Sequence, residues 1–389
     1  MSVVESANKH LFKWLWKLLI FLVILGISPL FFSCGNFVVI DSRGSSSVQP
    51  FLSSLGNSYI ENNKDKNIEI SVQAGGSSIG ISSIANNQTT MGNASKSPRS
   101  SVLNTNIESN WKNNELKTIT LAKDAIGILL LPPTNTNDIW SINSSNISIL
   151  YDAFAGYNSV SLNNFFDGDK TQIPDDIKIT PFARSGGAIS SGTAEAFLKD
   201  SNLLTTQLEP KTLDALNNGN YGNITQQTNE SNNEAYTNFK INARQPGSMI
   251  YLSLGFILNN LDTIKKDGFI VMKYSGVDPT LENVEKKLYN WIRPFNTIVS
   301  LHNNSRLQAI QEFVEWILFA KILYPNQLNL VNQIYLSEGL IRLSDDELKE
   351  MFLTNAETQK LTLDDLVWNH IDLFWKNDFS FSPVRFGVE

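Results

Sequence analysis

Apolar and polar positions near the start of the chain predict strands and helices in turn. The run Phe37–Asp41 is apolar and rich in strand-forming residues, and Asn67–Val72 alternates with a period of two. Between these runs, apolar residues recur at helical spacing, namely Val48, Phe51, Leu52, Leu55 and Tyr59. A shorter helical stripe follows the second strand, at Ile81, Ile84 and Ala85. Strands that alternate with helices predict an α/β fold with parallel strands.

Three later stretches also read as strands. Thr118–Leu131 predicts a long strand that ends at a proline pair, where we expect the chain to cross into a second lobe. Ile177–Phe182 is a second apolar run, and Trp291–Leu301 predicts a strand that returns to the first lobe. The segment Pro246–Tyr251 predicts a tight turn into a strand or a helix. Asn217–Asn242 is rich in Asn, Gln, Thr and Ser, so we interpret it as a solvated loop insertion.

Two helices near the C-terminus carry start signals. Ser305 with Gln308, and Ser344 with Glu347, fit the capping-box pattern in front of apolar stripes. Aromatic residues on the first of these helices, Trp316 and Phe319, are expected in the core rather than in a ligand platform.

The N-terminus has the pattern of a bacterial lipoprotein signal. Three lysines precede the uncharged stretch Leu18–Ser33, which ends directly before the single cysteine, Cys34. Phe31 and Phe32 are bulkier than usual at such a site, so an uncleaved membrane anchor stays an alternative. In both cases the rest of the chain faces the outside of the cell, because the lysines stay in the cytoplasm.

Composition narrows the classes of function. The chain has 389 residues, 18% of them charged, and a net charge of −7, which gives no support for nucleic-acid binding. One cysteine excludes an internal disulfide, and three histidines without ligand spacing make a metal site unlikely. We expect no cofactor. The length predicts two lobes. From the patterns along the chain we expect residues 1–33 to be a signal peptide, 34–131 the first part of lobe 1, 132–295 lobe 2, and 296–389 the return to lobe 1 with C-terminal helices.

Three loops rich in serine and glycine come between a strand pattern and a helix pattern. They are Gly44–Ser47, Gly75–Ser78 and Arg184–Thr193. The free N–H groups of a helix start, together with small hydroxyl side chains, form a good site for an oxyanion. Arg184 adds a fork of N–H donors that matches two oxygens of a tetrahedral anion. Such a site binds strongly and carries out no reaction.

These motifs, taken together, resemble the phosphate-binding proteins of ABC phosphate transporters. Gly44–Pro50 resembles their first ligand loop, Gly76–Gly80 their second, and Met91–Ser95 the segment after it. Arg184 followed by Ser191–Thr193 resembles their Arg…Ser-Gly-Thr loop. The Pro246–Tyr251 turn and the Arg293–Asn296 segment also fit, so the likeness runs in order from about Phe37 to Met351.

The resemblance implies a two-lobed, periplasmic-binding-protein-like type II α/β fold, with a mixed, mainly parallel sheet in each lobe. It implies that inorganic phosphate is bound between the lobes and delivered to the permease subunits of an ABC importer. The protein would be a non-enzymatic monomer, anchored by lipid on Cys34 at the outer face of the cell membrane. By position, the phosphate ligands would be Ser46, Ser47, Ser77, Ser95, Arg184, Ser191, Gly192 and Thr193.

The chain departs from the family pattern at its acidic residues. Some members carry an aspartate just after the segment that matches Ala94-Ser95, whereas this chain has Lys96. A second aspartate, expected between the arginine and the Ser-Gly-Thr motif, is also absent. Without a carboxylate to accept a proton, the rejection of sulfate loses its clearest mechanism. Lys96 itself could be a ligand or a solvated or salt-bridged lysine.

Three alternatives remain from the sequence. The ligand could be another oxyanion such as sulfate, or the chain could be a surface lipoprotein that has lost its ligand. The segment Gly76–Gly80 also satisfies G-x-S-x-G, so Ser78 could be the nucleophile of a serine hydrolase completed by His302 or His370.

Overall fold

The computed structural model describes residues 37–99, 105–134, 136, 139–302 and 306–376. Cys34 and the signal-like segment lie outside these residues, as does Ser305 of the first expected capping box. Within the described ranges, no helix is long and apolar enough to cross a membrane.

Nine strands of the described chain form one mixed sheet that runs through both lobes. The order along it is β2-β1-β3-β11-β4-β8-β6-β7, with β9 paired to β4. β1 pairs in parallel with β2 and β3, while β11 is antiparallel to β3 and β4. The strands are β1 Val38–Gly44, β2 Ile68–Ala74, β3 Met91–Ala94, β4 Leu116–Leu130, β6 Thr180–Arg184, β7 Gln226–Thr228, β8 Ser248–Ser253, β9 Ile270–Val271 and β11 Ile292–Ser300; the short pair β5 Ser141–Ile142 and β10 Lys273–Tyr274 stands apart.

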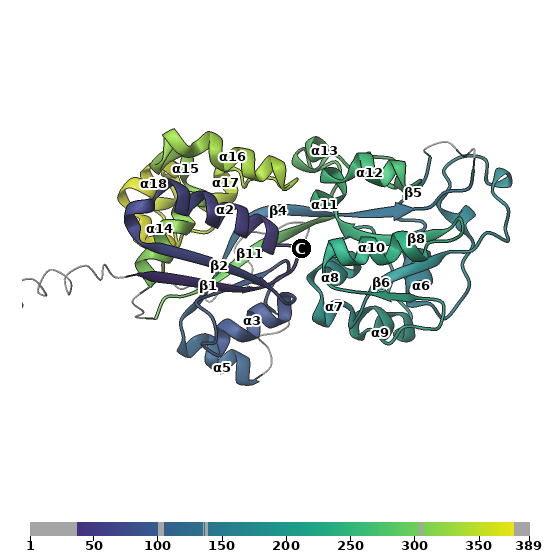
Figure 1. Ribbon diagram of the computed structural model, residues 1–389, viewed down its shortest axis with the longest axis horizontal. Helices are drawn as coiled ribbons and strands as arrows, with labels where there is room; N and C mark the ends of the chain where they lie inside the picture. The colour runs from purple at the N-terminus through teal and green to yellow at the C-terminus, as the bar shows by residue number, and fades with distance from the viewer. Residues whose placement is uncertain (1–36, 100–104, 135, 137–138, 303–305, 377–389) are drawn as a thin grey trace, which may run out of the picture.

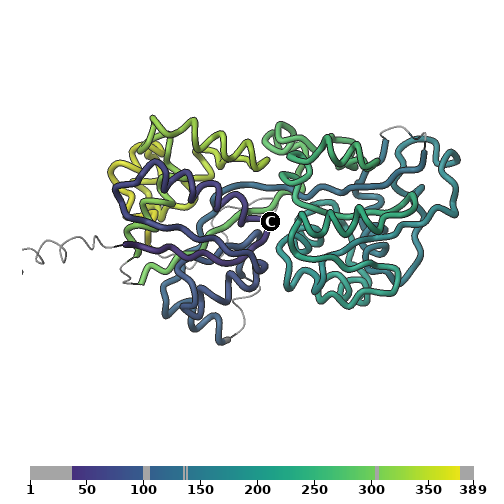
Figure 2. Tube along the Cα trace, viewed as in Figure 1, coloured from purple at the N-terminus to yellow at the C-terminus, as the bar shows by residue number. Residues whose placement is uncertain are grey.

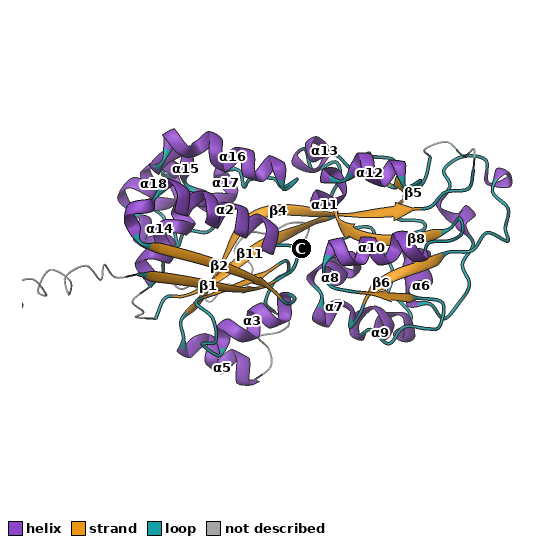
Figure 3. Cartoon of the chain, in the orientation of Figure 1, coloured by secondary structure: helices purple, strands orange, loops and turns teal. Residues whose placement is uncertain are grey.

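Helices cover the sheet on both sides in each lobe (Figure 3). The first lobe combines segments from both ends of the chain, which Figure 1 shows in purple and yellow. Its helices are α2 Gln49–Asn62, α3 Ser77–Ala85, α5 Thr105–Asn113, α14 Leu307–Leu318, α15 Ala320–Leu323, α16 Leu328–Ser337, α17 Asp345–Lys349, α18 Leu363–Asn369 and α19 Ile371–Phe374. Those of the second lobe are α6 Ile147–Ala155, α7 Gly187–Ser190, α8 Gly192–Lys199, α9 Pro210–Asn218, α10 Asn232–Asn242, α11 Leu254–Asn259, α12 Leu261–Lys266 and α13 Leu281–Glu285.

Two strands, β4 and β11, carry the chain from one lobe to the other (Figure 2). Leu121 and Ala122 of β4 pack in the core of the first lobe, whereas Ala125 and Ile126 pack in the core of the second. On β11 the same change occurs between Ile292 and Phe295. The lobes therefore meet where Arg293 lies opposite Asp124 in the β11–β4 register. The exact lobe boundaries of the sequence analysis stay a prediction.

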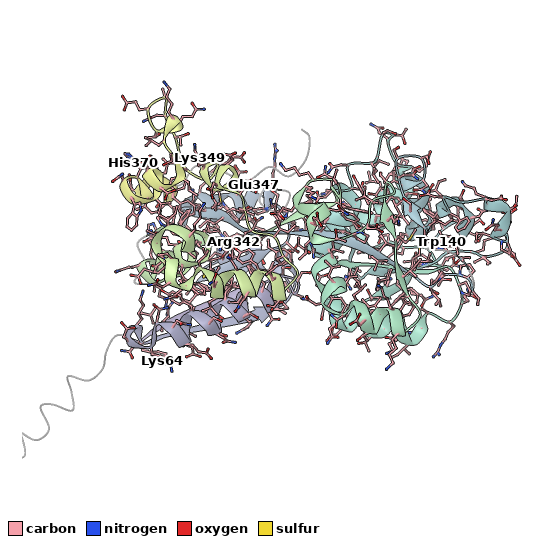
Figure 4. The ribbon with its side chains drawn as sticks, turned by 90° about the horizontal axis from the view of Figure 1, so that it is seen from above. Lys64, Trp140, Arg342, Glu347, Lys349 and His370 are labelled. Atoms are coloured by element: carbon pink, nitrogen blue, oxygen red, sulfur yellow. The ribbon has the colours of Figure 1, made fainter. Side chains whose placement is uncertain are left out.

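Each lobe has its own apolar core. In the first lobe, α2 buries Phe51, Leu55 and Tyr59, the positions that the helical stripe predicts. Trp316 and Phe319 are also buried there, as expected. Seen from above, Figure 4 places Arg342 and Glu347 in the first lobe and Trp140 in the second, where Trp140 packs on Phe166. The capping box of Ser344 with Glu347 is present at the start of α17.

The prediction of a solvated loop over Asn217–Asn242 is wrong. Its second half forms β7, which pairs with β6, and α10, which is capped by the Ser231 side chain. α10 buries Ala235, Tyr236 and Phe239, and these apolar residues lie on one face at helical spacing. The polar residues between them cover the other face, and their number concealed the short apolar stripe. This correction matters because the start of α10 lies beside the candidate site.

Candidate oxyanion-binding site

The first-lobe part of the site is a cluster of serine hydroxyls at the ends of β1, β2 and β3. Ser45 Oγ donates to Ser95 Oγ at 2.9 Å, and Ser77 Oγ lies 3.3 Å from the same atom. Ser77 Oγ also accepts from the backbone N–H of Ser95 at 3.1 Å. Gly44 allows this convergence, because a Cβ there would lie 1.9 Å from the carbonyl oxygen of Asn93.

The second-lobe part of the site comes directly against this cluster. Thr193 Oγ1, in the first turn of α8, lies 3.2 Å from Ser47 Oγ. A Cβ on Gly192 would lie 2.2 Å from Ser95 Oγ and 2.5 Å from Ser77 Oγ. Only a glycine lets the start of α8 approach the serines this closely, and the lobes are therefore in contact at this point.

Arg184 ends β6 with its side chain fully buried. Nη1 donates to the carbonyl oxygen of Asn229 at 2.9 Å and Nη2 donates to Asn232 Oδ1 at 2.7 Å, while Nε has no partner among the described residues. Desolvation lowers the pKa of Arg184, and the neighbouring charges of Glu230 and Arg293 act on it in opposite directions. Both hydrogen-bond acceptors are neutral, and among the described residues the guanidinium forms no ion pair, so its buried positive charge would favour an added anion.

The expected ligand set is brought together in part. Ser47, Ser77, Ser95, Gly192 and Thr193 form one contact cluster across the lobe junction. Arg184 connects to it through Asn232, whose Nδ2 donates to Ser47 Oγ at 3.4 Å. The remaining two expected ligands lie outside this cluster. Ser46 lines a cavity beside it, and Ser191 caps α8 by accepting from the N–H of Ala194. Their role in binding stays a prediction.

Sequence reasoning missed Arg293, which lies at the centre of the site. Its Nη1 donates to Thr193 Oγ1 at 3.0 Å and to Ser95 Oγ at 3.3 Å, so it contacts both lobes. Its Nε donates to Asp124 Oδ2 at 2.8 Å, and Nη2 lies 2.7 Å from the same oxygen. The available signal was the Arg293–Asn296 segment, which fits the family pattern although the sequence analysis gave its arginine no role in the site.

Glu230 supplies a carboxyl group that the sequence motifs did not reveal. It precedes α10, and its Cγ lies close to the second serine loop, 3.8 Å from a Cβ built on Gly76. Its Oε1 is shielded from solvent and has no hydrogen-bond partner among the described residues. Burial raises the pKa of Glu230, although the charge of Arg184 and a hydrogen bond with the Ser191 side chain oppose the shift, followed by the charges of Arg293 and Lys96. The expectation that the site lacks an acidic acceptor is therefore corrected.

Lys96 is salt-bridged, one of the two roles that the sequence left open. Nζ lies 3.1 Å from Glu195 Oε2 and donates to the carbonyl oxygen of Ile189 at 3.2 Å. The bridge joins the first lobe to α8 of the second. Ser78, the nucleophile of the hydrolase alternative, donates its hydroxyl to the same carbonyl at 2.6 Å. That hydroxyl is used in a contact between the lobes.

Charge is unevenly compensated around the junction. Arg293 is paired with Asp124, and Lys96 is paired with Glu195. Arg184 forms no ion pair with any residue that the structure describes, and the raised pKa of Glu230 weakens the one carboxyl near it. Donors from both lobes and a guanidinium without an ion pair are the groups that would hold a small anion here.

The fold is that of the two-lobed type II binding proteins, and solved structures of this class match most of the chain. A protein of Clostridium perfringens with bound phosphate, described as a candidate phosphate ABC transporter substrate-binding protein, matches with a TM-score of 0.55 and 19% identity over 79% of this chain and 100% of that one. A phosphate transport receptor of Vibrio cholerae matches with a TM-score of 0.51 and 20% identity over 78% and 100%. The phosphate-bound periplasmic protein PfluDING matches with a TM-score of 0.56 and 14% identity over 85% of this chain and 98% of that one.

The chain belongs to the family of the uncharacterized lipoprotein MG412 of Mycoplasma genitalium. The two are 38% identical over 383 residues, which cover 94% of this chain and 97% of the relative. No protein-family model matches the chain.

Proposed function

We propose that the protein is an extracytoplasmic binding lipoprotein that holds phosphate between its two lobes and delivers it to an ABC importer. The observation that carries the proposal is the buried, unpaired guanidinium of Arg184 beside hydroxyls that both lobes supply. The fold shared with phosphate-binding proteins and the lipoprotein relative support it. In this proposal Cys34 carries the lipid, and the protein works as a monomer that docks on the permease.

The eight expected ligands act together with Arg293 and Asn232 in this proposal. Hydroxyls and backbone N–H groups hold the phosphate oxygens, Arg184 neutralises the charge, and Arg293 holds the hydroxyls of both lobes in place. Hydrogen bonds to a charged group contribute about 1.5–3 kcal/mol each, so a few of them supply the roughly 8 kcal/mol of a micromolar complex. Glu230 favours phosphate over sulfate, because phosphate can share a proton with a carboxylate and fully ionised sulfate cannot.

Calorimetric titration of the protein without residues 1–36 with phosphate and with sulfate at neutral pH tests the proposal. We expect a Kd for phosphate in the micromolar range or below and at least tenfold weaker binding of sulfate. A preference for sulfate would assign a different oxyanion. No heat with either anion would favour a lipoprotein that has kept the fold without the ligand. Labelling of Ser78 by a fluorophosphonate would instead indicate a hydrolase.

A further inference from the structure

A cavity of about 420 Å³ lies between the lobes, beside the hydroxyl cluster. Its first-lobe wall includes Ser46, Ser47 and Gln49 at the start of α2, and its second-lobe wall includes the start of α10, at Ser231–Asn233. A phosphate ion needs space on the order of 100 Å³, since one water occupies about 30 Å³ of the liquid. The cavity is in the range of about 300–1,000 Å³ that is typical of pockets for small organic molecules.

The cavity is continuous with the candidate oxyanion site, because two residues belong to both. Ser47 lines the cavity, and its Oγ lies 3.2 Å from Thr193 Oγ1. Asn232 also lines the cavity, and its Oδ1 accepts from Arg184 Nη2 at 2.7 Å. A group bonded to an anion at Arg184 and Ser47 would therefore extend into this space.

The cavity wall is polar but nearly uncharged. Among the described residues that line it there is no lysine or arginine, and the one carboxylate, Glu338, accepts from Ser54 Oγ at 2.8 Å. Ser46, Asn233 and Asn259 form no side-chain hydrogen bond with the rest of the described chain, so their polar groups are available to a ligand. Six apolar residues complete the wall, namely Pro50, Phe51, Ala74, Phe256, Phe295 and Leu340. This chemistry suits a neutral hydroxylated group and disfavours a second anion.

We propose that the protein binds phosphomonoesters of small hydroxylated compounds, with the phosphoryl group in the oxyanion site and the organic group in the cavity. This inference rests on the proposed function, because it needs the same oxyanion site. It goes beyond that function by naming a ligand class larger than the inorganic ion. Ser46, before α2, and the amides of Asn233 on α10 and Asn259 on α11 would contact the organic group from both lobes and add to its affinity.

Competition calorimetry with inorganic phosphate, glycerol 3-phosphate and glucose 6-phosphate tests this inference. We expect at least one ester to bind ten times more tightly than inorganic phosphate. If phosphate binds and both esters bind more weakly, the inference is overturned and the proposed function stands. If none of the three binds, the proposed function fails as well.

A double variant, Asn233→Leu with Asn259→Leu, tests the cavity itself. We expect it to remove the advantage of the ester and to leave the affinity for inorganic phosphate unchanged, because neither residue contacts the hydroxyl cluster. Asn242→Leu, at the far end of α10, is the matched control and should leave both affinities unchanged. An ester advantage that persists in the double variant would overturn the assignment of the organic group to this cavity.

Discussion

Two arginines are buried at the junction of the lobes, and they differ in the partners of their guanidinium groups. Arg293, on β11, is paired with Asp124 on the neighbouring strand β4 and holds hydroxyls of both lobes. Within the described residues, the side chain of Arg184, at the end of β6, donates to a backbone carbonyl and an amide oxygen and forms no ion pair. In the proposed function this difference gives the two arginines different roles: the charge of Arg293 is satisfied inside the protein and stabilises the junction, whereas the charge of Arg184 neutralises the ligand.

Removal of the satisfied arginine should have the largest effect. Arg293→Ala leaves Asp124 buried without its cation, and breaking a buried ion pair in this way costs about 3–5 kcal/mol. We expect urea denaturation to show a loss of that size in the free energy of unfolding. Arg244→Ala, at an exposed arginine of the second lobe, is the control and should change stability by less than about 0.5 kcal/mol. Equal stability of the two variants would contradict the role given to Arg293.

In the proposed function, contact between the lobes brings the first-lobe hydroxyls and Arg184 to one anion. Gly192→Ala places a methyl group against Ser95 and Ser77, and overpacking of this kind costs about 1–3 kcal/mol. We expect phosphate affinity to fall by about 30-fold, the middle of that range. In the control Gly75→Ala, the added methyl meets only the Ile79 side chain at 3.4 Å, and binding should stay close to that of the wild type. Unchanged affinity in Gly192→Ala would place the anion away from the α8 contact.

Glu230 is the carboxyl on which the charge of Arg184 acts more strongly than that of Arg293. Because its pKa is raised, the carboxyl becomes neutral as the pH falls through a value above its ordinary one, and its repulsion of a fully ionised anion is then lost. Sulfate binding to the wild type should therefore strengthen toward low pH, whereas Glu230→Gln should bind sulfate with little dependence on pH. We expect the variant to reduce the ratio of phosphate to sulfate affinity about tenfold at neutral pH. The same pH profile in both proteins would exclude Glu230 from the site.

A smaller effect, on stability, is expected at Asp200, which follows α8 and interacts with the charges of Glu195 and Arg293. Burial, first, and then Glu195 raise the pKa of Asp200 to about 7, while Arg293 opposes the shift. A carboxyl whose pKa is raised in the folded state stabilises that state while it is protonated. The contribution is complete below the unfolded-state pKa, near 4, and is lost as the pH rises from there through the folded-state pKa of about 7. Asp200→Asn should therefore gain stability over the wild type as the pH rises, with an advantage at pH 8 that exceeds the one at pH 5 by about 2 kcal/mol.

Chemical denaturation at the two pH values measures this difference. Asp176→Asn, at an exposed aspartate of the same lobe, is the control. If the advantage of Asp200→Asn does not grow between pH 5 and pH 8, the carboxyl is not buried as described.

Local patterns were enough to predict much of the fold. The alternation of Ile68, Ile70 and Val72 predicted β2, and the apolar stripe after Pro50 predicted α2, because both signals depend only on neighbours in the sequence. α10 was missed because its apolar face is short and lies among amides.

The site was predictable only where its residues form contiguous motifs. The three serine–glycine loops are such motifs, and five of the eight expected ligands meet in the structure. Arg293, Asn232 and Glu230 come from other segments, and strand pairing and helix packing bring them to the loops. The spacing of residues along the chain does not predict these contacts, so the roles of Arg293 and Glu230 in the site became visible only in the tertiary structure.

The central claim is that the unpaired charge of Arg184 binds the ligand, and one calorimetric comparison tests it directly. Phosphate is titrated into the wild type, Arg184→Ala and the control Arg244→Ala, with thermal unfolding measured on the same samples. We predict that Arg184→Ala binds at least 100-fold more weakly, about 2.7 kcal/mol, and unfolds within a few degrees of the wild type, while Arg244→Ala behaves as the wild type. Wild-type affinity in a folded Arg184→Ala protein would contradict the account.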